Sequence, residues 1–64
     1  MRSYHEFYTL DEALGYRHEN NTGGWIFAPD QGRPVYLFPP DMPPIDIFHH
    51  PLTKGKSGKL LSNA

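Results

Sequence analysis

The chain has 64 residues, no cysteine and a net charge of −1, with six basic side chains against seven acidic ones. This length predicts one domain at most, and the absence of cysteine excludes disulfides and thiolate metal sites. No segment approaches the run of about 18 apolar residues that spans a membrane, and the first residues lack the apolar run of a signal peptide. We therefore expect a cytoplasmic protein.

The first third of the chain predicts a strand and a helix. Tyr4–Tyr8 is rich in aromatic residues and is typical of a short strand. The sequence Thr9-Leu10-Asp11-Glu12 has the spacing of a capping box, which marks the start of a helix. Leu10 and Leu14 would face the core, and residues 20–24, which include two asparagines and two glycines, would end the helix after about three turns.

The middle of the chain predicts a β-hairpin. Trp25–Ala28 and Val35–Phe38 are the two strand candidates, and Pro29-Asp30-Gln31-Gly32 suits a turn. The proline-rich segment 39–44 is expected to be a stiff connector. Residues 45–50 fit both a helical and a strand period, and Pro44 favours a short helix.

These elements predict an α+β fold. We expect a single domain over residues 1–52, with a three-stranded, mostly antiparallel sheet, one capped α-helix and a short C-terminal helical turn. Residues 53–64 contain three lysines and no acidic residue, and we expect them to be a flexible basic tail that Leu60 and Leu61 can anchor.

Large apolar side chains on both faces of the hairpin indicate a binding surface. One predicted helix covers only one face, so an aromatic patch would remain for a homodimer or for another protein. The alternative is that residues 42–52 or the Leu60-Leu61 end fold back over this face. The candidate partner-binding residues are Trp25, Phe27, Tyr36 and Phe38. The expected function is therefore non-enzymatic binding or regulation through protein–protein contact, as is common among bacterial and phage accessory proteins.

A nucleic-acid-binding module is the alternative function. Lys54, Lys56 and Lys59 can contact phosphates, although residues 1–50 oppose this because three arginines face all seven acidic residues. Gly55-Lys56-Ser57 also matches the end of a phosphate-binding loop, but His50 stands where that motif needs its first glycine. A mobile segment is the better interpretation of these residues.

The residues for catalysis or metal binding are sparse. The serines lie near the ends of the chain, and cysteine is absent. His49 and His50 are adjacent and would point in different directions, whereas a metal needs three or four convergent ligands. We expect no enzymatic activity, no catalytic residues, no cofactor and no metal; the sequence leaves the role of the two histidines open.

Overall fold

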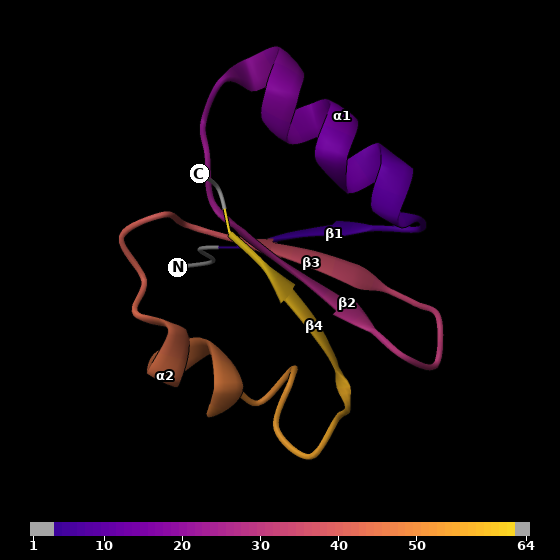
Figure 1. The fold of residues 1–64 in the computed structure, drawn as a ribbon, viewed down its shortest axis with the longest axis vertical. Helices are drawn as coiled ribbons and strands as arrows, with labels where there is room; N and C mark the ends of the chain where they lie inside the picture. The colour runs from indigo at the N-terminus through magenta and orange to yellow at the C-terminus, as the bar shows by residue number, and fades with distance from the viewer. Residues whose placement is uncertain (1–3, 63–64) are drawn as a thin grey trace.

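A computed structural model describes residues 4–62 of the chain. It has one antiparallel sheet with the strand order β1-β3-β2-β4 and two helices (Figure 1). The predicted α+β class is confirmed, with four strands where three were predicted. The elements are β1 (His5–Phe7), α1 (Leu10–Asn20), β2 (Trp25–Pro29), β3 (Val35–Phe38), α2 (Pro44–Phe48) and β4 (Gly58–Leu61).

The predicted capping box starts α1. The backbone N–H of Glu12 donates to Thr9 Oγ1 at 3.2 Å, and the N–H of Thr9 donates to Glu12 Oε1 at 3.3 Å. These bonds satisfy two of the backbone groups that a helix N-terminus leaves without partners. Asn21 ends the helix in the left-handed conformation, with φ of 51°.

The predicted hairpin forms the centre of the sheet. Trp25 pairs with Phe38 and Phe27 with Tyr36, and the N–H of Gly32 closes the turn on the carbonyl of Pro29 at 3.2 Å. β1 adds to the other side of β3, where Glu6 lies opposite Tyr36. The turn residues therefore set the register in which alternate side chains face opposite sides.

β4 differs from the sequence-based prediction. Gly58–Leu61 belong to the segment expected as a flexible tail, but they pair with β2, from Ile26 opposite Leu61 to Pro29 opposite Gly58. Gly58 permits this approach because a Cβ atom there would lie 2.6 Å from the carbonyl oxygen of Ala28. Backbone hydrogen bonds hold Lys56 to Thr53 and Ser57 to Asp30, so the predicted mobility stays a prediction for residues 54 and 55. Residues 1–3 of the predicted domain and 63–64 of the predicted tail lie outside the described residues.

The helices cover opposite faces of the sheet, which gives three layers (Figure 1). On one face, Ala13 of α1 packs in a cluster with Ile26, Val35 and Leu37, all at most 4% exposed. On the other face, Ile47 of α2 packs in a second cluster with three aromatic residues, Phe27, Tyr36 and Phe38. The chain thus buries both sides of its hairpin.

Arg17 links α1 to two strand ends. Its Nη1 donates to the carbonyl of Gly24, before β2, and to that of Ser62, after β4, both at 3.0 Å. One guanidinium therefore holds the helix against segments far apart in the sequence. Within residues 4–62, neither helix has the length and apolar character needed to cross a membrane.

Candidate functional site

The predicted aromatic binding face is buried inside the domain. Phe27, Tyr36 and Phe38 are only 1%, 4% and 1% exposed, and Trp25 is half-buried. α2 and the segments before and after it cover this face, because Met42 and Leu52 pack against the same cluster as Ile47, as does Leu60 of β4. The alternative cover named from the sequence is therefore the one observed. No partner can reach the three buried rings while α2 stays in place.

Polar contacts in the turn after α2 hold this cover. The hydroxyl of Thr53, itself 3% exposed, donates to the carbonyl of Ile47. The N–H of Leu52 donates to His50 Nδ1 at 3.1 Å, and the His50 ring packs against Phe38 with ring centroids 5.2 Å apart. His50 therefore has a structural role that the sequence left open, since it fixes the turn and extends the aromatic cluster.

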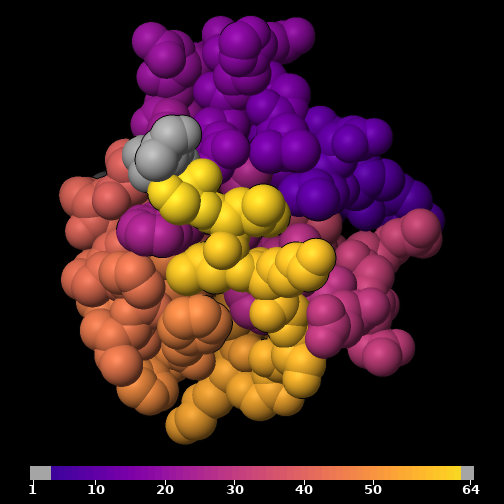
Figure 2. Space-filling model, viewed as in Figure 1, coloured from indigo at the N-terminus to yellow at the C-terminus, as the bar shows by residue number. Residues whose placement is uncertain are grey.

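The outer side of α2 carries exposed apolar side chains. Ile45 is 62% and Phe48 is 49% exposed, whereas Ile47 between them is fully buried. Residues 45 and 48 are three positions apart, so they lie on the same side of a helix. We call this pair the α2 ridge. Figure 2 shows the surface around α2 (orange) beside β4 (yellow).

The sequence did not predict the α2 ridge. The helical spacing of Ile45 and Phe48 was visible, but such spacing more often marks the buried side of a helix. In this five-residue helix the buried contact is made by Ile47 alone. Which side faces the sheet depends on the connector before α2 and the turn after it, and these are tertiary features.

The three lysines of the nucleic-acid alternative are all exposed. Lys59 lies in β4 opposite Ala28, while Lys54 and Lys56 lie in the turns before that strand. The Nζ atom of Lys56 is 5.8 Å from the centroid of the Tyr36 ring. The ammonium group of Lys56 therefore lies over the ring of Tyr36.

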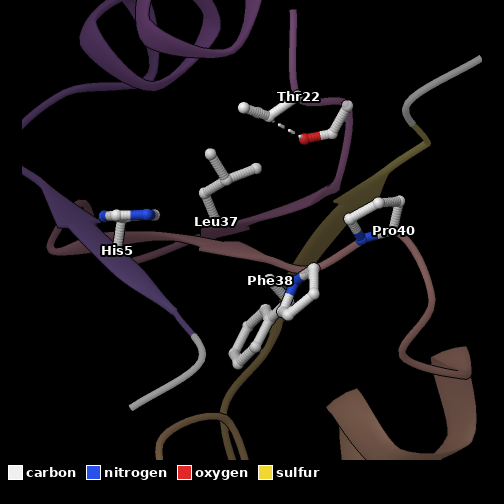
Figure 3. Close-up of a pocket in the computed structure, with 7 residues that line it drawn as sticks. His5, Thr22, Leu37, Phe38 and Pro40 are labelled. Carbon is white, nitrogen blue, oxygen red and sulfur yellow. Dashed lines mark hydrogen bonds between the residues drawn. The ribbon is translucent and has the colours of Figure 1, made fainter. Parts of the chain in front are cut away.

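Among the hollows in the surface of residues 4–62, two stand out. The smaller has a volume of about 250 Å³ and lies at the end of β3, between His5, Thr22, Leu37 and the prolines 39 and 40 (Figure 3). The Thr22 hydroxyl is already used, since it donates to the Gly23 carbonyl at 3.1 Å. The larger hollow, of about 500 Å³, lies between the β2–β3 turn and the segment before β4. Of these two hollows, the larger is the one lined by arginine and lysine side chains.

One titratable group stands out. Burial raises the pKa of the Tyr36 hydroxyl, and the charge of Glu6 on the neighbouring strand adds to this effect. Among residues 4–62, no three histidine or carboxylate side chains lie close enough together to hold a metal ion.

Comparison with protein-family models, with curated proteins and with solved structures finds no significant match to this chain.

Proposed function

We propose that this chain is a non-enzymatic binding protein that acts through contact with another protein, and that the α2 ridge is its contact surface. The observation that carries this proposal is the exposure of Ile45 and Phe48, at 62% and 49%, on one side of α2. Adjacent large apolar side chains are typical anchors of a helix that lies in a groove. The proposed contact replaces the buried aromatic face that the sequence had indicated.

The chemistry around the ridge supports a particular kind of partner. Asp41 and Asp46 are exposed on the connector and on α2 itself, so the ridge is flanked by negative charge. A groove with an apolar floor and a basic rim fits this arrangement. A whole phenylalanine side chain can bury about 150–250 Å², and Phe48 still exposes about half of its own surface. A specific interface buries roughly 800 Å² per partner, whether the partner is a second copy or another protein, so residues beyond the ridge must contribute to the contact.

A photo-crosslinking experiment tests the proposal. A photoreactive phenylalanine analogue is placed at position 48, and a matched control carries it at position 19, which is exposed on α1. We expect discrete adducts with one partner from position 48 alone. With that partner purified, Phe48→Ser should weaken binding by roughly 1–2 kcal/mol, the value of a side chain that binding buries. Equal adducts from both positions would refute the assignment.

Nucleic-acid binding is the second candidate. The observation that favours it is that Arg33 lines the larger hollow together with Lys56, which adds a fourth basic residue to the three exposed lysines. Salt distinguishes the two functions. Phosphate contacts weaken steeply between roughly 50 and 200 mM salt, whereas an apolar contact through the α2 ridge changes little. In either case we place the chain in the cytoplasm, as its cysteine-free composition favours.

A further inference from the structure

The larger hollow is built from two segments that are held together. The β2–β3 turn contributes Asp30, Gln31 and Arg33, and the segment before β4 contributes Lys56 and Ser57. The backbone N–H of Asp30 donates to the Ser57 carbonyl at 2.8 Å, which ties the two walls to each other. Its volume of about 500 Å³ lies within the usual range for a small-molecule site.

Tyrosine rings position the two basic side chains of this hollow. The guanidinium of Arg33 lies 3.9 Å from the centroid of the Tyr8 ring, and its Nη1 donates to the Tyr8 hydroxyl at 2.5 Å. The Nζ atom of Lys56 lies over the ring of Tyr36, 5.8 Å from its centroid. A cation held against an aromatic ring loses less freedom when it binds a ligand. The two contacts restrict both side chains, and the guanidinium of Arg33 keeps further N–H donors, beyond the one that Tyr8 accepts, for a ligand.

The charges of the hollow select the chemical class of the ligand. Arg33 and Lys56 supply two positive charges, and the Asp30 carboxylate opposes them with one negative charge. A guanidinium presents planar paired donors and an ammonium a point charge, and both suit phosphate oxygens. We propose that this hollow binds the phosphate group of a small phosphomonoester, with Arg33 and Lys56 as its ligands. This site does not depend on the α2 ridge.

Amide NMR titration at low ionic strength tests the site with glycerol phosphate as the probe and glycerol as the uncharged control. We expect saturable shifts at residues 30–33 and 55–57 at roughly millimolar phosphate. Arg33→Gln and Lys56→Gln should each raise the dissociation constant at least about fivefold, since each removes a charge-assisted contact. Lys54→Gln is the matched control and should change it by less than about twofold, because Lys54 does not line the hollow.

Asp30→Asn gives a test with the opposite sign. Removing the opposing carboxylate should tighten phosphate binding about two- to fivefold, whereas a residue needed only for structure would weaken it. Equal losses from Lys54→Gln and Lys56→Gln, or shifts that do not saturate, would overturn the proposal. Binding of a single-stranded oligonucleotide without binding of glycerol phosphate would overturn it in favour of nucleic acid.

Discussion

Replacing Ile47 with alanine tests whether α2 is the element that closes the aromatic face of the sheet. Ile47 is fully buried and packs against Phe27, Tyr36 and Phe38. The substitution removes three buried carbon atoms and leaves a cavity beside the rings. Such changes cost about 2–5 kcal/mol. The free energy of unfolding of a domain of this size is only several kcal/mol, so this substitution should remove a large part of it.

Ile45→Ala is the matched control, because it makes the same chemical change on the same helix. Ile45 is 62% exposed, so its truncation should cost no more than about 1 kcal/mol. Any gain from the higher helix propensity of alanine is similar in the two variants and cancels in their difference. The free energy of unfolding should therefore differ between the variants by roughly 2–4 kcal/mol.

Urea unfolding followed by Trp25 fluorescence measures this difference. If Ile47→Ala does not fold, Ile47→Val replaces it, with an expected cost of about 0.5–1.5 kcal/mol. Equal losses from positions 45 and 47 would refute the placement of α2. A native-like Ile47→Ala protein with unchanged stability would show that the aromatic face does not need this cover.

The remaining predictions concern the cap, the buried tyrosine, the turn before β4 and metal ions. Thr9→Ala should cost about 1 kcal/mol in urea unfolding and Thr9→Ser much less, because serine keeps the capping hydroxyl; equal losses would contradict this. Burial raises the pKa of Tyr36 in the folded chain, so the hydroxyl loses its proton more easily in the unfolded chain. The stabilisation by the neutral hydroxyl is therefore complete below about pH 10, and it is lost as the pH rises through the pKa of the folded state. Above about pH 10, the urea midpoint should fall less in Tyr36→Phe than in the wild-type chain. An identical fall in both proteins would contradict a raised pKa of Tyr36 as the cause. Amides of residues 54 and 55 should show order parameters below about 0.6, clearly under those of the hairpin. Dialysis against a chelator should leave the thermal midpoint unchanged, and a drop that zinc reverses would reveal a metal site.

Local signals determined the first helix and the hairpin. Thr9 and Glu12 are three residues apart, and the two hydrogen bonds of the capping box follow from that spacing alone. The turn residues 29–32 and the apolar runs on either side likewise predicted the two central strands. These features depend on residues close in sequence, so a pattern in the sequence is enough to find them.

The candidate sites depended on contacts that no local pattern contains. Phe27, Tyr36 and Phe38 were correctly placed on strands, but their burial was decided by Ile47 and by the side chains that pack with it, among them Met42 and Leu52. The α2 ridge exists because that one residue faces inward. The hollow with Arg33 and Lys56 joins residues 23 positions apart, and neither segment alone indicates it.

The sequence by itself determined where the chain turns, where the first helix starts and which residues alternate across the hairpin. Only the tertiary structure decided that Gly58–Leu61 is a strand, because that segment is short, begins with glycine and lysine, and is ordered by pairing with β2 about 30 residues earlier. Gly58, which lies in the segment predicted to be a flexible tail, instead permits the close approach of two strands. Propensity acts between neighbouring residues, whereas burial and strand pairing depend on which distant segments meet.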